Sequence, residues 1–229
     1  MRWMRSVSLM AFLMTARVCW SPLALAEDSP AMTTAQLIEA VETAYSEVQA
    51  VKADFVQTSA SAITGQTTQQ GILELKRPQK ARWEFTAPQK SLLVADGQKI
   101  WIYTPADNQV IVTPDVGGAS NPTSDLMGLL TDLSQVNQYF DVKTTEDGDT
   151  TGHTLQLTPT DDELKAQIQT LQLTLSRDEY LLQKMVMTDA FGQVTTLEFS
   201  NVNLKAQIDD ARFTFQVPDG ATVIDAAGI

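Results

Sequence analysis

Apolar and polar residues alternate with a period of two over much of this chain, and this alternation constrains its fold more than any other feature. It is clearest in residues 71–105, where Pro78 and Pro88 interrupt it. Alternation of this kind is typical of strands that bury one face, and prolines mark the turns between them. The stretch therefore predicts three strands, at residues 73–76, 83–85 and 100–103.

The third of these strands is apolar on both faces. Ile100 and Ile102 point to one side, and Trp101 and Tyr103 point to the other. A strand at the surface of an antiparallel sheet normally leaves one polar face in water. We therefore expect other parts of the chain to cover both faces of this strand.

Further strands are predicted on either side of this stretch, and a polar segment at residues 59–70 is expected to form a hairpin connection. The predicted strands cover residues 53–58, 110–112, 139–143, 153–158, 168–176, 181–188, 194–199 and 213–217. Together they give about ten or eleven half-buried antiparallel strands. A sheet of that width usually curls.

Two helices are expected beside the sheet. Thr33 and Gln36 form a capping-box pattern, and apolar residues then recur at helical spacing as far as Val48 or Val51, which predicts about five turns. A second, very apolar short helix is predicted at residues 125–133. The predicted fold is mainly β with helices (α+β): a curved antiparallel sheet forming an incomplete half-barrel, with the helices over its concave side.

Residues 1–26 have the composition of a cleaved signal peptide, with Arg2 and Arg5 before an apolar run and Ala24-Leu25-Ala26 as the cleavage site. Cys19 follows Arg17 and Val18, which is not a lipid-attachment pattern. We therefore expect a soluble periplasmic protein with one domain, residues 27–229. No later apolar run approaches the ~20 residues needed to span a bilayer.

The charge of the chain argues against nucleic acid as a partner. Its formal net charge is −12, and it becomes −15 when the three arginines of the predicted signal peptide are removed. An acidic surface of this kind repels nucleic acid and anionic membranes.

The sequence gives little support for catalysis, a metal or a cofactor. Its one histidine, His153, lies in a predicted strand, where a structural role is the usual one. The acidic run at residues 161–163 is expected to be a solvated loop, since no spaced set of metal ligands surrounds it. No nucleophile elbow, phosphate-binding loop or zinc motif occurs. We therefore expect a protein that is not an enzyme.

Several motifs occur in the order and spacing of a known family: residues 75–78 (Leu-Lys-Arg-Pro), 82–83 (Arg-Trp) and 96–103 (Asp-Gly-x-x-x-Trp-x-Tyr). Residues 53–57 (Ala-Asp-Phe-Val-Gln), 211–215 (Ala-Arg-Phe-Thr-Phe) and 218–220 (Pro-Asp-Gly) extend the match over nearly the whole mature chain. In these motifs the chain resembles the periplasmic outer-membrane lipoprotein carriers. The resemblance implies a monomer that takes acylated lipoprotein cargo from an inner-membrane ABC-type releasing complex to an outer-membrane lipoprotein receptor.

The resemblance also implies roles for particular residues. Arg77 corresponds to an arginine that holds the helical lid closed, a task suited to the five donors of a guanidinium. Lys76, Lys80 and Arg82 are candidates for docking an acidic partner, with a solvated strand edge as the alternative. The apolar candidates for an acyl-chain cavity, each of which could instead be ordinary core, are Tyr45, Val48, Leu73, Leu75, Trp83, Phe85, Trp101, Tyr103, Leu126, Met127, Leu130, Met185 and Met187.

Two other functions stay open at the level of sequence. The same fold could carry another amphiphile, such as a glycolipid or another lipid. An enzyme is the third possibility, and convergent polar side chains on the cavity floor would favour it.

Overall fold

The fold is described by a computed structural model, which covers residues 32–63, 65–114, 136–145 and 152–226. The predicted signal peptide at residues 1–26 and the predicted short helix at residues 125–133 lie outside these ranges. The residues from Met32 onward form one compact unit.

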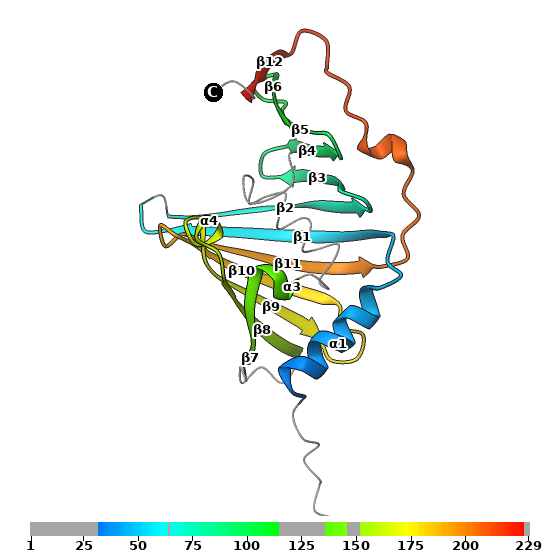
Figure 1. Cartoon of the computed structure of the whole chain (residues 1–229). Coiled ribbons are helices and arrows are strands. Elements are labelled where there is room, and N and C mark those ends of the chain that lie inside the picture. Colours follow the sequence, from blue (N-terminus) through cyan, green and yellow to red (C-terminus); the bar gives the residue numbers. More distant parts are fainter. Residues whose placement is uncertain (1–31, 64, 115–135, 146–151, 227–229) are drawn as a thin grey trace, which may run out of the picture. The chain divides into compact units, whose positions relative to one another are not determined.

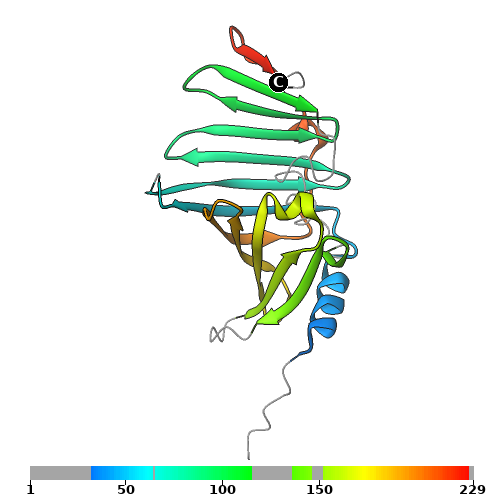
Figure 2. The same ribbon diagram turned by 60° about the vertical axis from the view of Figure 1, so that its left-hand side comes forward.

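A single 12-stranded sheet makes up most of this unit, in the order β12-β6-β5-β4-β3-β2-β1-β11-β10-β9-β8-β7. The two end strands, β12 and β7, do not pair with each other, so the sheet is open, and Figures 1 and 2 show that it curves. The mainly β, incompletely closed sheet is therefore confirmed. The strands are β1 (Ala50–Ser61), β2 (Gly65–Lys76), β3 (Lys80–Ala87), β4 (Ser91–Asp96), β5 (Lys99–Thr104), β6 (Gln109–Pro114), β7 (Phe140–Thr145), β8 (Gly152–Pro159), β9 (Ile168–Ser176), β10 (Leu182–Asp189), β11 (Val194–Asn203) and β12 (Thr222–Asp225).

The predicted hairpin is present at residues 59–70, but the connection is much shorter than predicted, because most of this polar segment is strand. β1 and β2 pair without interruption from Ala50 opposite Lys76 to Ser61 opposite Gly65. Threonines are frequent in strands because their branched side chains suit a pleated backbone. Here they extend a hairpin beyond the end of β3 with little burial.

Two further strand predictions were incomplete. β4 was missed because its apolar residues form a continuous run without alternation. Residues 213–217 are not a strand: Phe213 ends a short 3₁₀ helix, η2 (Asp210–Phe213), and the last strand, β12, comes later and pairs in parallel with β6. The sheet is therefore antiparallel except at this edge.

The first helix, α1 (Thr34–Tyr45), begins at the predicted capping box. The backbone N–H of Gln36 donates to the Thr33 hydroxyl at 3.3 Å, and the backbone N–H of Thr33 donates to Gln36 Oε1 at 3.0 Å. The helix is shorter than predicted, since Val51 already lies in β1. Two four-residue helices, α3 (Val136–Tyr139) and α4 (Asp162–Lys165), precede β7 and β9.

The strand register places most of the large apolar side chains on one face, which we call the inner face. Phe55 lies opposite Phe199, Leu73 opposite Trp83, and Met185 opposite both Leu173 and Leu197. Leu37, Val41 and Tyr45 of α1 belong to the same buried cluster. The inner face is therefore a continuous apolar surface on which α1 packs.

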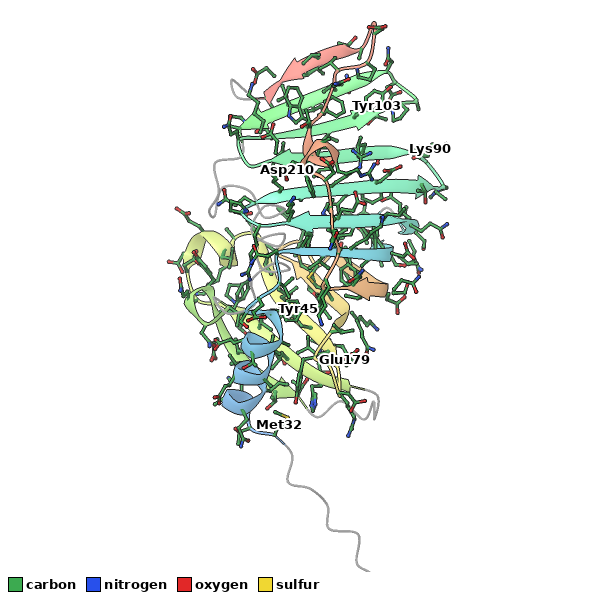
Figure 3. The ribbon with its side chains drawn as sticks, turned by 90° about the vertical axis from the view of Figure 1, so that its right-hand side faces the viewer. Met32, Tyr45, Lys90, Tyr103, Glu179 and Asp210 are labelled. Carbon is green, nitrogen blue, oxygen red and sulfur yellow. The ribbon has the colours of Figure 1, made fainter. Side chains whose placement is uncertain are left out.

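The opposite, outer face is covered in part by residues 204–221, which we call the C-terminal strap. Figure 3 shows this segment, which carries Asp210, crossing the strands on its way to β12. η2 packs on β3 and β4. Farther along, Phe215 stacks on Trp101 with ring centroids 5.5 Å apart. Both faces of β5 are thus covered in part, with Ile100 buried on the inner face and Phe215 against the outer one.

Candidate functional site

The inner face collects most of the residues predicted to hold acyl chains. Those in or against its apolar cluster are Tyr45, Val48, Leu73, Leu75, Trp83, Phe85, Met185 and Met187. Leu126, Met127 and Leu130 lie outside the described residues. The cluster is well covered, since Leu73 is 2% exposed and Leu75 is 1% exposed.

Part of the inner face is less completely buried. Phe85, Leu93, Ile102, Met187 and Phe199 are each partly exposed and pack against the buried cluster. Their side chains are aliphatic, aromatic or thioether, and such surfaces adapt to flexible apolar ligands. This part of the inner face is the most accessible candidate for an apolar binding site.

Three aromatic rings connect this accessible part to the buried cluster. Phe55 meets Trp83 edge to face at 4.9 Å and Phe85 at 5.2 Å. Within the described part of the chain, Trp83 Nε1 is buried without a hydrogen-bond partner. A buried donor without an acceptor is uncommon, so the Trp83 indole is a group of the inner face that could donate to a ligand.

Trp101 and Tyr103 do not belong to this group. They lie on the outer face, where Phe215 of the C-terminal strap stacks on Trp101 and contacts Tyr103. The Trp101 indole donates to Asp96 Oδ2 at 3.3 Å. The structure therefore does not bring them together with the other predicted acyl-chain residues. Alternation assigns them a common face, but it does not say which face is the inner one.

Arg77 lies in the turn between β2 and β3, beside the end of α1. Its backbone N–H donates to the carbonyl of Gln49 at 2.9 Å, and its guanidinium donates to the carbonyl of Tyr45, the last residue of α1, at 3.4 Å. The last carbonyls of a helix lack partners within the helix and carry its negative dipole end. α1 has no basic residue in its own last turn, so Arg77 supplies a positive charge there from the sheet.

Tyr45 fixes the same end of α1 to the other half of the sheet. Its hydroxyl oxygen accepts the backbone N–H of Leu182 at 3.1 Å. Burial raises the pKa of Tyr45, and the hydrogen bond from Leu182 opposes that shift in part. At the start of the helix, the hydroxyls of Thr34 and Thr144 lie 2.9 Å apart. The described contacts of α1 with the sheet thus include only a few polar ones.

The basic cluster predicted as a docking surface is engaged by the C-terminal strap. Lys76 Nζ and Lys80 Nζ lie 2.8 and 3.2 Å from Asp210 Oδ1, and Lys76 also donates to the carbonyl of Ile208 at 2.8 Å. Hydrogen bonds and charges from Lys76 and then Lys80 hold the pKa of Asp210 below its usual range. Arg82 bonds Glu84 at 3.0 Å and reaches the carbonyl of Arg212 at 3.4 Å. A docking role for these residues stays a prediction.

Glu74 is the charged residue that sequence reasoning missed. It is 3% exposed on the outer face, where Arg212 Nη2 lies 2.7 Å and Lys52 Nζ 3.1 Å from its carboxylate. Burial favours the neutral acid, but hydrogen bonds and charges from Arg212 and Lys52 outweigh burial and hold the pKa of Glu74 below its usual range. Only its position between apolar residues in a strand pointed to a buried carboxylate.

The one histidine of the chain, His153, stacks on Tyr180 with ring centroids 5.8 Å apart. Within the described ranges, no group of three or more His, Cys, Asp or Glu side chains is placed to hold a metal ion. In the same ranges, no helix has the length and apolar character required to cross a bilayer. The candidate site is the apolar inner face, with α1 packed against part of it.

These features define a class: an open β-sheet protein organised around one continuous apolar face, with a helix packed against part of it. The family described as "Outer membrane lipoprotein carrier protein LolA" matches residues 46–216. This chain belongs to that family, as the motifs around Arg77 and Trp101 predicted.

Relatives agree with this assignment over most of their length. The outer-membrane lipoprotein carrier protein of Chromohalobacter salexigens is 34% identical over 208 residues, covering 90% of this chain and 91% of its own. That of Methylobacillus flagellatus is 30% identical and covers 82% and 88%. An uncharacterized conserved protein from Thermus thermophilus shares the fold, with a TM-score of 0.51 at 14% identity, over 83% of this chain and 98% of that one.

Proposed function

We propose that the mature protein is a periplasmic carrier that binds the acyl chains of lipoproteins released from the inner membrane and delivers them to an outer-membrane receptor. The observation that carries this proposal is the continuous apolar inner face beneath α1, in a chain of the outer-membrane lipoprotein carrier family. Relatives named outer-membrane lipoprotein carrier protein align over most of the chain, which supports the same role here.

The energetics of such a carrier require a competing closed state. Each methylene removed from water contributes about 0.8 kcal/mol, so one long acyl chain contributes on the order of 10 kcal/mol. A carrier with no nucleotide-binding motif in its sequence can release such a ligand only if the empty, covered state is also stable. α1 on the inner face, held by Arg77 and Tyr45, is the described cover that would supply this competition.

The route of the protein follows from the same proposal. The signal peptide at residues 1–26 would export it, and residues 27–229 would act as a monomeric single domain. An inner-membrane ABC-type complex would load it, and an outer-membrane lipoprotein receptor would unload it. Lys76 and Lys80 would meet an acidic partner by giving up Asp210, and Arg82 would do so by giving up Glu84.

Photocrosslinking from the two faces of the sheet tests the proposal. A photoreactive amino acid replaces Phe85, on the accessible part of the inner face, or Trp101, on the outer face. We expect triacylated lipoprotein to crosslink through its acyl chains at position 85 and not at position 101. A non-acylated form of the same lipoprotein should crosslink at neither position.

Three results would contradict the proposal. Crosslinks to the protein part of the cargo in both forms would exclude acyl-chain recognition. If a different amphiphile crosslinks at position 85 and lipoprotein cannot displace it, that other lipid is the cargo. Equal crosslinking at positions 85 and 101 would exclude the inner face as the site.

A further inference from the structure

Two large apolar side chains project into water from neighbouring hairpin tips. Ile63, between β1 and β2, is 94% exposed, and Phe191, between β10 and β11, is 96% exposed. β1 and β11 are paired, and Ala60 lies opposite Val194. Each apolar residue stands three positions beyond this pair, so the two tips lie side by side at one end of the sheet, at the left in Figure 1. We call Ile63 and Phe191 the tip pair.

Defined turns hold both members of the tip pair outward. The backbone N–H groups of Phe191 and Gln193 both donate to Asp189 Oδ1 at 2.8 Å, and Gly192 takes a φ of +80° that favours glycine. The N–H of Ile63 donates to the Ser61 hydroxyl at 3.2 Å. The backbone of each tip is therefore satisfied locally, and the apolar side chain is left pointing into water.

The sequence around the tip pair carries almost no charge. The 19 residues 55–73 and the eight residues 190–197 contain no Asp, Glu, Lys or Arg, in a chain whose net charge is −12. The one carboxylate in the second tip, Asp189, already accepts two backbone hydrogen bonds. Ile63 and Phe191 can therefore enter an uncharged interface with few ions beside them to desolvate, Asp189 being the one carboxylate within the tip segments.

We propose that the tip pair is a membrane-contact site that inserts Ile63 and Phe191 into the interface of a lipid bilayer. A stable protein interface needs about 800 Å² of matched surface on each side, and two separate projecting side chains do not provide that. A fluid lipid interface needs no matched shape, and it receives aromatic and aliphatic side chains from an uncharged rim. The biological sense of this contact depends on the proposed carrier function, since a carrier must visit membranes and leave them again.

The acidic residues near the tips determine the preferred lipid. The N–H of Ala190 donates to the carbonyl of Gln167, which brings the second tip close to the end of α4. That short helix contains Asp162 and Glu163, with Lys165 in its last turn. Because the acids outnumber the lysine, we expect contact with zwitterionic lipid and weaker contact with anionic lipid.

Vesicle flotation of the full chain, without cargo, tests the proposal. The probes are phosphatidylcholine–phosphatidylethanolamine vesicles and the same vesicles with added phosphatidylglycerol. Ile63→Ser and Phe191→Ser should each lower the partition coefficient on zwitterionic vesicles by about tenfold. Val223→Ser is the matched control, because Val223 is 48% exposed in β12 and lies outside the tips. Phe191→Trp should retain binding, and its fluorescence should shift to the blue on zwitterionic vesicles.

Any of the following results would contradict the proposed membrane contact. Wild-type protein that does not float, or Ser variants that float like wild type, would exclude insertion. Binding that depends on Phe191 only when membrane proteins are present would assign the tips to a protein partner. A dimer that Phe191→Ser dissociates would assign them to a second copy of this chain. The photocrosslink from position 85 is measured separately. If the flotation experiment fails, the proposed carrier function is unaffected, and if the photocrosslink fails, the proposed membrane contact is still tested by flotation.

Discussion

Arg77 illustrates how one side chain can connect the sheet to its helical cover. Its guanidinium bonds the last carbonyl of α1, and its backbone bonds Gln49 in the segment that leads into β1. Both contacts are made when α1 lies on the inner face. Loss of the side chain should therefore weaken the covered state without removing residues from the core.

We predict that Arg77→Leu unloads cargo more slowly and keeps the fold. The hydrogen bond to Tyr45 is long, so its loss should lower the stability of the covered state by about 1 kcal/mol, which is about fivefold in the competition with cargo. The measurement is the rate of lipoprotein transfer to outer-membrane acceptor, together with the melting temperature. Arg177→Leu, in the exposed turn after β9, is the control and should transfer at the wild-type rate. Equal rates for Arg77→Leu and wild type would remove the latch role.

The buried carboxylate of Glu74 should make the stability of the fold depend on pH. Its pKa is lower in the folded chain than the ordinary value of 4.5, so its ionised form stabilises the fold above that pH. This contribution is lost as the pH falls through the lower folded-state value. In urea unfolding from pH 7 to pH 3, Glu74→Gln should be less stable at pH 7 and should show a smaller decline in acid.

The control for this experiment is Glu179→Gln, in an exposed turn. It should keep both the wild-type stability at neutral pH and the wild-type decline. If Glu74→Gln declines as steeply as wild type, the acid sensitivity of the fold has another origin.

The C-terminal strap covers part of the outer face of the sheet, as α1 covers part of the inner face. It covers Trp101 and Tyr103 with Phe215, buries Phe213 beside Ala50 and Ile208, and pairs Arg212 with Glu74. The strap is irregular chain, yet it carries aromatic and charged contacts that a strand edge alone would lack. It should therefore contribute to stability although it has little secondary structure.

We predict that Phe215→Ala lowers the free energy of unfolding by about 2 kcal/mol, because it removes a ring that is stacked on Trp101. Urea unfolding measures the loss, and the emission of Trp101 should shift to the red as water reaches it. Phe191→Ala replaces the same residue type at a position that is 96% exposed, and it should change stability by less than about 0.5 kcal/mol. If Phe215→Ala loses as little stability as Phe191→Ala, the packing of Phe215 in the strap is dispensable.

Whether a strand was predicted correctly from the sequence depended on how its two faces are buried. β9 alternates between buried and less buried residues, and the pattern placed its ends correctly. β4 has apolar residues on both faces, and the end of the β1–β2 hairpin has almost none buried, so neither gives a half-buried signal. Phe213, at the end of η2, and Phe215, in the irregular chain after it, have the spacing of a strand because both pack against the sheet.

The same reasoning explains how much of the candidate site was predictable. Leu73, Leu75, Trp83 and Met185 gather on the inner face because period-two spacing and hairpin register together determine a common side. Trp101 and Tyr103 have the same spacing but the opposite side, and only the register of β4 with β5 determines that. Arg82 and Lys76 reach their strap partners across more than 120 residues, a separation that no local pattern encodes.

The proposed competition between α1 and cargo for the inner face predicts that fixing α1 in place weakens binding. Thr34 of α1 and Thr144 of β7 have hydroxyls 2.9 Å apart, so cysteines at both positions are within reach of a disulfide. We predict that Thr34→Cys with Thr144→Cys, in a chain with Cys19→Ser, binds triacylated lipoprotein at least about tenfold more weakly when oxidised. Reduction should restore binding, as measured by co-purification of the cargo.

A matched pair of cysteines tests whether the helix itself is responsible. Thr58 and Thr68 have hydroxyls 3.4 Å apart across β1 and β2, and a disulfide there leaves α1 free. This control should bind cargo equally well in both redox states. Full binding by the oxidised Thr34–Thr144 variant would mean that cargo enters without displacement of the start of α1.

The pairing of β12 with β6 has a consequence for shortened chains. β12 lies more than a hundred residues after β6, so a polypeptide that ends before position 222 keeps β6 but lacks its partner. Its sheet then ends at the six-residue β6, whose unpaired amides can bind a neighbouring molecule. The complete chain ends instead at β12, an edge strand of only four residues. Shortened chains should therefore accumulate as insoluble material to a greater extent than the complete chain.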